Sequence, residues 1–264
     1  MEKKDMSELE NAKEKYKNYS KLMYKWKDDC KTNGVYKNDE KAQKNVFIVD
    51  GIVCPKEWFK QEIRPLFVLK EAYCQNNSKN EIDETEWING TYTESIKNST
   101  FKRLIDWARI IFDDSSDGGY NWNNEIFKNI ALINIKKYGG QSYSDNEDLK
   151  KHAIQHADFI FEQIELIYPT IIICGYTGWL LDEVWKKKGM GNARLKGTGR
   201  VYEVLINGRS VSLVDFWHPA CRTNHLAEFR SDIKAIKEKT EAIGKAPYQP
   251  PKDDDSENES KDTF

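Results

Sequence analysis

The sequence lacks the long apolar stretches that place a protein in a membrane. No apolar run approaches the roughly 18 residues that a membrane-spanning helix needs. Residues 1–9 are charged and contain no apolar segment of the kind that marks a secretory signal. We therefore expect a cytoplasmic protein with no membrane partner.

Cysteine is also scarce and scattered. The chain has 5 cysteines, and no two of them form a Cys-x-x-Cys pair. This argues against a disulfide framework, a zinc ribbon and a cysteine-held iron–sulfur cluster. His152 and His156 are four residues apart on a predicted helix, but no His-Glu-x-x-His motif accompanies them. Phosphate-loop and Gly-x-Ser-x-Gly motifs are missing as well, so we expect neither a metal nor a cofactor.

Apolar and aromatic residues are plentiful enough for a folded core. They make up 39% and 12% of the 264 residues, which excludes wholesale disorder. We divide the chain into a helical extension at 1–43, an α/β domain at 44–244 and an acidic, disordered tail at 245–264.

The net charge of −2 hides an uneven distribution. Between 186 and 209 the chain carries 7 basic residues and only one acidic residue, Glu203. Such a basic stripe is typical of a contact with the phosphate backbone of nucleic acid, although a solvated loop would look the same. The candidate DNA-binding residues in this stripe are Lys186, Lys187, Lys188, Arg194 and Lys196.

Apolar runs alternate with helical patterns along the middle of the chain. The runs at 63–69, 130–135 and 170–174 are mostly apolar and do not alternate with polar residues, which predicts parallel strands buried on both faces. The dipeptide Asn207-Gly208 predicts a hairpin turn between two further strands, 201–206 and 211–216. The remaining expected elements are a strand at 44–51, helices at 5–30, 100–112, 145–167, 178–187 and 226–241, and loops at 74–98 and 113–124.

Polar residues follow these strands where ligands usually bind an α/β sheet. Glu71, Asn134 and His218 each come after a predicted strand, and Gly175 ends another. A carboxylate, an amide and a histidine at one edge are the components of a hydrolytic site. Each also has an ordinary alternative: a helix cap, a turn residue and a buried histidine respectively.

The order of these segments resembles that of the uracil-DNA glycosylase superfamily over about residues 44–240. Residues 69–73 (LKEAY) are similar to the first family motif, and 132–134 (LIN) to the motif whose Asn reads the base. Residues 169–175 (PTIIICG) resemble the third strand, and 218–220 (HPA) resemble the His-Pro-Ser motif, the most specific of the four. The chain departs from the family at Lys70, Ala72 and Ala220.

The resemblance implies a fold, an activity and a set of site residues. The implied fold is a three-layer α/β sandwich with a four-stranded, mainly parallel sheet flanked by helices. The implied activity is that of a monofunctional, monomeric DNA glycosylase, which flips a base out of duplex DNA and hydrolyses its N-glycosidic bond. Glu71 and His218 are then catalytic, whereas Asn134, Tyr73 and Lys70 bind the base. The segment with Pro219, Ala220 and Arg222 contacts the DNA.

Two alignments of the first motif remain open, and with them the substrate. In one, Glu71 replaces the water-activating Asp, and Tyr73 excludes 5-substituted pyrimidines, which favours uracil. In the other, Glu71 and Ala72 match a Glu-Ala pair, and Cys74 falls where Tyr would block.

The two long loops add a substrate hypothesis. Aromatic residues at Trp87, Tyr92 and Trp122 would suit a sugar-bearing base, as in anti-phage members that remove glucosylated hydroxymethylcytosine, although both loops could be plain surface. A catalytically inactive nucleic-acid-binding relative is the third possibility.

Overall fold

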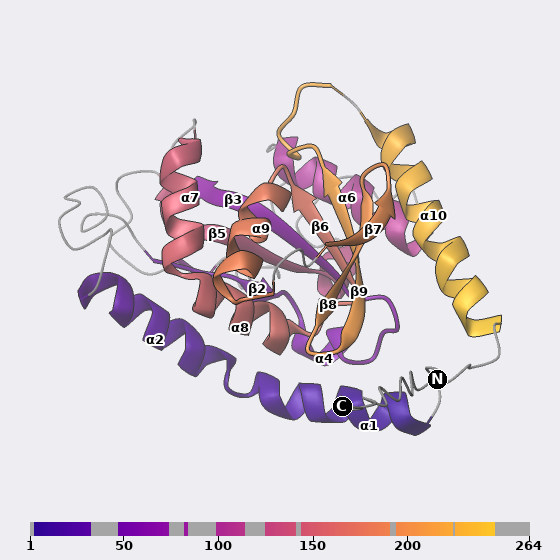
Figure 1. Ribbon diagram of the computed structural model, residues 1–264, viewed down its shortest axis with the longest axis horizontal. Helices are drawn as coiled ribbons and strands as arrows, with labels where there is room; N and C mark the ends of the chain where they lie inside the picture. Colours follow the sequence, from indigo (N-terminus) through magenta and orange to yellow (C-terminus); the bar gives the residue numbers. More distant parts are fainter. Residues whose placement is uncertain are drawn as a thin grey trace, which may run out of the picture.

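The central sheet of the protein joins strands that are distant in the sequence. The computed structural model describes residues 3–32, 47–73, 82–83, 99–113, 125–140, 144–190, 194–223 and 225–245. Seven strands form one sheet in the order β2-β5-β3-β6-β9-β8-β7 (Figure 1). Their bounds are β2 (Gly51–Ile52), β3 (Pro65–Tyr73), β5 (Ala131–Gly140), β6 (Ile171–Gly175), β7 (Arg194–Thr198), β8 (Val201–Ile206) and β9 (Arg209–Phe216).

The middle of this sheet is parallel and its borders are antiparallel. β5, β3, β6 and β9 run in the same direction, whereas β2, β8 and β7 pair antiparallel. The predicted α/β sandwich is therefore confirmed, but the prediction of a four-stranded sheet is wrong. The additional strands come from the hairpin around Asn207 and Gly208, both at positive φ, and from the short β2 and β7 at the edges.

Helices cover both faces of the sheet. Side chains of β3 alternate between the two cores, with Leu66 and Val68 in one and Phe67 and Leu69 in the other. The first core is closed by α7 (Asn146–Gln155), α8 (Ala157–Ile167) and α9 (Gly178–Lys187). The second is closed by α6 (Ser99–Phe112), the 3-10 helix η2 (Glu125–Asn129) and α10 (Leu226–Lys245).

The two amino-terminal helices contribute to the first core. α1 (Lys3–Tyr16) and α2 (Tyr19–Thr32) pack along the outside of α8, as the lower part of Figure 1 shows. Met23, Trp26 and Cys30 are buried there, so the apolar residues that interrupt a charged sequence line the helix interface. The short helix α4 (Pro55–Trp58) joins the same core, where the Trp58 indole donates to the Ile167 carbonyl at 2.8 Å.

Several boundaries differ from those expected from the sequence. The predicted helix 145–167 is two helices, because His156 between them adopts φ −100° and ψ 22°. The predicted strand 44–51 is divided into β1 (Ile48–Val49) and β2, and β1 pairs with β4 (Ile82–Asp83) inside a predicted loop. β3 and β5 also continue four and five residues beyond their predicted ends, because their polar residues still pair across the sheet.

A buried carboxylate lies at the break between β1 and β2. Asp50 is fully buried, and its Oδ1 accepts from the Lys137 ammonium at 2.5 Å and the Gln163 amide at 2.8 Å. Its Oδ2 accepts from the backbone and side-chain nitrogens of Asn134 at 2.7 and 3.2 Å. The Tyr19 hydroxyl donates to its carbonyl. Asp50 thus connects α2, the β1–β2 edge, β5 and α8.

We expect Lys137→Met to reduce the free energy of unfolding by about 3–5 kcal/mol, because it leaves the Asp50 charge buried without its cation. The double variant Asp50→Asn/Lys137→Met should lose less than the sum of the two single changes, since neither charge remains. Urea denaturation of the parent and the three variants measures this coupling. A Lys137→Met protein as stable as the parent would contradict it.

Candidate functional site

The parallel strands reverse their order between β3 and β6. The chain passes from β3 to β5 on one side and then crosses to β6 and β9 on the other. Ligands of open α/β sheets bind beyond the carboxyl ends of the strands at such a switch point. The residues at these ends are Lys70 and Glu71 on β3, Gly175 at the end of β6 with Tyr176 and Thr177 after it, and Trp217 and His218 after β9.

Glu71 is a nearly buried carboxylate held by a lysine of the neighbouring strand. Its side chain is 5% exposed, and its Oε2 lies 3.3 Å from the Lys136 ammonium, which also binds Asp148 on α7 at 2.7 Å. Burial works against the charge of Lys136, but its two carboxylate partners outweigh burial and raise its pKa. Lys136, which sequence reasoning left without a role, therefore fixes the position of the Glu71 carboxylate.

Asn134 lies within β5 and not after it. Its backbone is in register with Leu69, two positions before the Glu71–Lys136 pair. The residue is 1% exposed and its amide nitrogen donates to Asp50. The structure therefore places Asn134 next to β3, two residues before Glu71. The buried Asp50 fixes the orientation of the Asn134 side-chain amide.

His218 is held as a neutral imidazole with a defined tautomer. Burial, together with the charge of Lys70, lowers its pKa to about 4. The Ala220 backbone N–H donates to Nδ1 at 3.1 Å, so the neutral ring carries its proton on Nε2. The local His-Pro-Ala sequence thus supplies both the histidine and the N–H group that selects its donor nitrogen.

The turn after β6 brings the other strand ends close together. A Cβ on Gly175 would lie 2.8 Å from Leu69 Cδ2 and 3.0 Å from Pro219 Cδ, so only glycine lets these segments approach. The Thr177 hydroxyl donates to the Val68 carbonyl at 2.7 Å and ties this turn to β3. Between them Tyr176 has φ 59°, and the Lys70 ammonium lies 4.7 Å from its ring centroid.

The other predicted site residues lie at the margin of this site or outside the residues that the structure describes. Tyr73 is the last residue of β3 and pairs with Gly140, and Arg222 is exposed in the segment after His218. The predicted pocket residues Trp87, Tyr92 and Trp122 lie outside the described residues.

The basic stripe is spread over α9, β7 and the β7–β8 turn. Lys186 and Lys187 end α9, whose ten residues place them roughly 13 Å along the helix from the Gly178 end. Acidic groups from other positions accompany the stripe: Lys188 binds Asp158 at 2.6 Å, and Arg200 binds Asp232 at 3.0 Å. Arg194 and Lys196 belong to β7.

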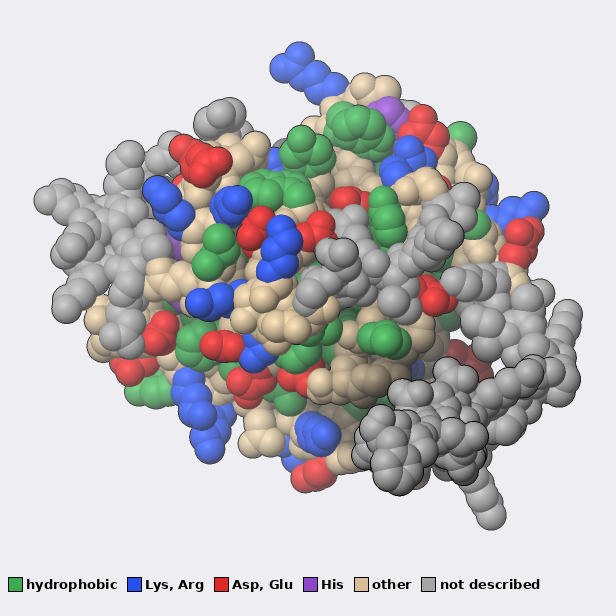
Figure 2. Space-filling view, in the orientation of Figure 1, with side chains coloured by type: hydrophobic (Ala, Val, Ile, Leu, Met, Phe, Trp, Pro, Cys, Tyr) green, Lys and Arg blue, Asp and Glu red, His purple; other side chains and the backbone are tan. Residues whose placement is uncertain are grey.

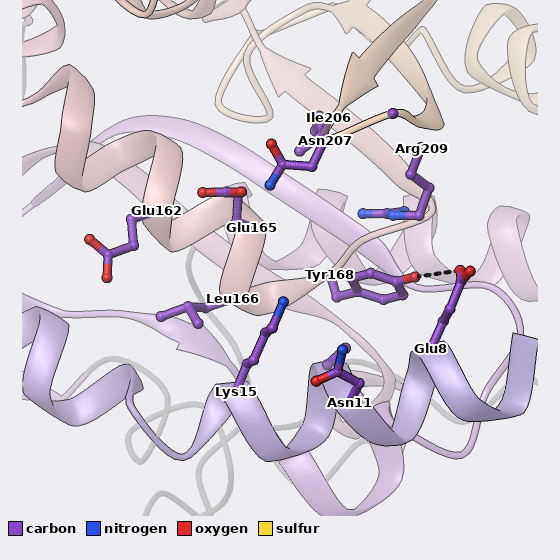
Figure 3. A pocket seen from close by; sticks show the side chains of 12 residues that line it. Glu8, Asn11, Lys15, Glu162, Glu165, Leu166, Tyr168, Ile206, Asn207 and Arg209 are labelled. Carbon is purple, nitrogen blue, oxygen red and sulfur yellow. Dashed lines mark hydrogen bonds between the residues drawn. The ribbon is translucent and has the colours of Figure 1, made fainter.

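A separate cavity of about 640 Å³ lies at the opposite end of the parallel strands. It is lined by α1, α8 and the β8–β9 turn (Figure 3), and Tyr168 and Arg209 come just before β6 and at the start of β9. The Arg209 guanidinium lies 4.0 Å from the Tyr168 ring centroid. The Tyr168 hydroxyl donates a hydrogen bond to the Glu8 carboxylate at 3.5 Å. The cavity is therefore at the amino ends of the parallel strands and contains none of the predicted site residues.

His152 and His156, considered above as a metal pair, are core residues. Both are 1% exposed, and His156 Nε2 lies 3.7 Å from the Cys30 sulfur. Burial lowers the pKa of His156 to about 3. In the part of the chain that the structure describes, no group of three or more His, Cys, Asp or Glu residues could hold a metal ion.

No family model matches this sequence, and no curated protein is significantly similar to it. The resemblance to glycosylases therefore depends on the motif residues themselves. Among the described residues, no helix has both the length and the apolar character to cross a membrane.

We expect the His218 ring to remain neutral from pH 8 to pH 5, because its pKa is about 4. Lys70→Met should raise this pKa, since it removes a like charge. Ring resonances followed by NMR against pH measure both effects. Lys60→Met, on an exposed residue paired with Glu57, serves as the control, and a His218 titration near 6.5 would contradict the assignment.

Proposed function

We propose that this chain is a monofunctional DNA glycosylase, which hydrolyses the N-glycosidic bond of a flipped-out, non-standard base and leaves an abasic site. The observation that carries the proposal is a neutral His218 with its proton on Nε2, at the same sheet edge as the Glu71 carboxylate. A neutral donor and a fixed carboxylate suit a reaction that separates a base anion from a cationic sugar.

The proposed reaction uses one water molecule and no cofactor. The bond between C1′ and the base nitrogen breaks, and its electron pair leaves with the base. His218 Nε2–H donates a hydrogen bond to the departing base, which finally takes up a proton. Glu71 stabilises the positive sugar and orients the water that adds its oxygen to C1′, and the water's proton balances the reaction. Lys70 contacts the base edge, and the segment with Pro219, Ala220 and Arg222 contacts the DNA, whereas the buried Asn134 would have to become accessible to read the base.

We propose glucosylated hydroxymethylcytosine in phage DNA as the base, and hence a role in cytoplasmic antiviral defence. The aromatic residues Trp87, Tyr92 and Trp122 of the two long sequence loops support this choice. Uracil is the second candidate, supported by Tyr73 at the same strand end as Glu71.

The substrate is tested with duplexes that contain uracil, glucosylated hydroxymethylcytosine or only ordinary bases. Alkali reveals abasic sites by cleaving the strand. Strand cleavage in one modified duplex identifies the base. Binding without cleavage in all three would favour a nucleic-acid-binding protein without catalytic activity.

We expect His218→Ala to slow base release by about a hundredfold, the usual effect of removing one preorganised donor. DNA affinity should change little, because the hydrogen bond strengthens mainly as the base departs. Single-turnover excision and equilibrium DNA binding on the same protein measure the two effects. Unchanged excision would remove His218 from the mechanism.

We expect Glu71→Gln to abolish base release while the protein stays folded. Gln keeps the shape but carries no charge. Lys136 keeps Asp148 as its partner, so the free energy of unfolding should fall by only about 1 kcal/mol.

Glu125→Gln is the matched control, because this exposed carboxylate also pairs with a lysine but lies on η2. Melting temperature and single-turnover excision separate catalysis from stability. A stable Glu71→Gln variant that excises at the parent rate would overturn the catalytic assignment.

A further inference from the structure

Two exposed aromatic side chains lie at the candidate site, and the reaction proposed above does not use them. Among the described residues the large exposed hydrophobic side chains are Tyr24, Tyr176, Leu205 and Trp217. Tyr176 is 47% exposed and Trp217 is 43% exposed. Both follow strands of the parallel core directly, at the edge that holds Glu71 and His218.

The pairing of the strands makes these two residues neighbours. Gly175 of β6 is in register with Phe216 of β9, and Tyr176 and Trp217 are the next residues on the two chains. The Tyr176 backbone N–H donates to the Phe216 carbonyl at 2.7 Å, which continues the pairing by one step. Adjacent strands are about 4.8 Å apart, so the backbones of the two aromatic residues lie side by side where the strands end.

The backbone of Tyr176 has a conformation that disfavours its own side chain. At φ 59° a glycine or asparagine would be less strained than a tyrosine. Tyr168 also has a positive φ, but it ends helix α8 and its ring is covered by Arg209. The Tyr176 ring also has a cation, Lys70, beside it, but it ends no helix and stays 47% exposed, so the strain is kept at a residue whose ring faces solvent.

Basic residues accompany the aromatic pair. Lys70 lies over the Tyr176 ring, and Arg222 is exposed five residues after Trp217. Arg103 of α6 donates to the Thr223 carbonyl at 3.1 Å and brings a third positive group to this segment. Figure 2 shows hydrophobic, basic, acidic and histidine side chains together at the top of the molecule, where Figure 1 shows the β9–α10 connection.

One side of Trp217 is already supported. The His225 ring stacks on it with centroids 5.1 Å apart and planes at 19°, and Glu228 binds His225 at 2.9 Å. This stack fixes the direction of the indole while 43% of the residue stays exposed. A pre-oriented aromatic surface loses little conformational freedom when a ligand stacks on it.

We propose that Tyr176 and Trp217 form a stacking platform for unpaired nucleobases that flank the base to be excised. Aromatic side chains beside phosphate-binding cations are how proteins hold single-stranded nucleic acid without reading its sequence. The inference rests on the proposed function for its biological setting, and it specifies the substrate as DNA whose strands are separated around the target. The protein therefore binds single-stranded DNA through its bases as well as its phosphates.

The test compares two 12-nucleotide probes on the full chain, one of oligo-dT and one of the same length without bases. The parent should bind oligo-dT more tightly, and Tyr176→Gly and Trp217→Ala should each weaken oligo-dT binding about tenfold without changing binding of the base-free probe. Tyr176→Gly also removes the backbone strain, so it should not unfold the protein. Tyr24→Ala, at an exposed tyrosine on α2, is the matched control, and Tyr176→Phe and Trp217→Phe should retain most of the preference.

Excision by the same proteins separates the two proposals. Equal binding of the two probes by the parent, a preference that survives both substitutions, or duplex excision without single-strand binding would each overturn the platform. A preference for oligo-dT that both variants lose, together with an absence of base release from every DNA, would support the platform and contradict the glycosylase.

Discussion

The buried residue Asp50 connects the amino-terminal helix α2 and the edge strands β1 and β2 with β5 and α8. The Asp50 carboxylate accepts hydrogen bonds from β5 and α8, and the Asp50 backbone carbonyl accepts one from Tyr19 of α2. Burying a charge is costly unless it is paired and fully hydrogen-bonded, and here both oxygens have two donors each. Because the donors come from β5 and α8, the Asp50 charge is paired only when helix, edge strand and sheet pack together.

This constraint reaches the candidate site through β5. Lys136 and Lys137 are consecutive, yet Lys137 binds Asp50 in the core and Lys136 binds Glu71 at the strand end. The position of β5 against the edge strand therefore also sets where the Lys136 ammonium meets β3. Asn134, two residues earlier, is fixed by the same carboxylate. The positions of Asn134 and Glu71, the groups proposed to hold the base and the water, thus depend on Asp50, which contacts neither the base nor the water in the proposed reaction.

Local patterns predicted the parallel core well. The apolar runs of β3, β5 and β6 and the Asn207-Gly208 turn are signals within one segment, and the structure has all four. The strand ends were misplaced because a polar residue does not by itself end strand pairing. Glu71 and Lys136 continue their strands as a buried pair, and each is polar when considered alone. Asp50 was missed for a related reason: followed by glycine, it looks like a turn residue, and its partners are 84 to 113 residues away.

The electrostatics of the edge give the proposed chemistry its direction. Two ammonium groups, Lys70 and Lys136, lie around one nearly buried carboxylate and one histidine that burial keeps neutral. A protonated histidine would attract any DNA phosphate equally in the ground state and the transition state, which gains nothing in rate. A neutral Nε2–H donor beside Lys70 interacts weakly with a neutral base and strongly with the anion that forms as the glycosidic bond breaks. The same burial that lowers the pKa of His218 therefore directs its hydrogen bond toward the transition state of the proposed reaction.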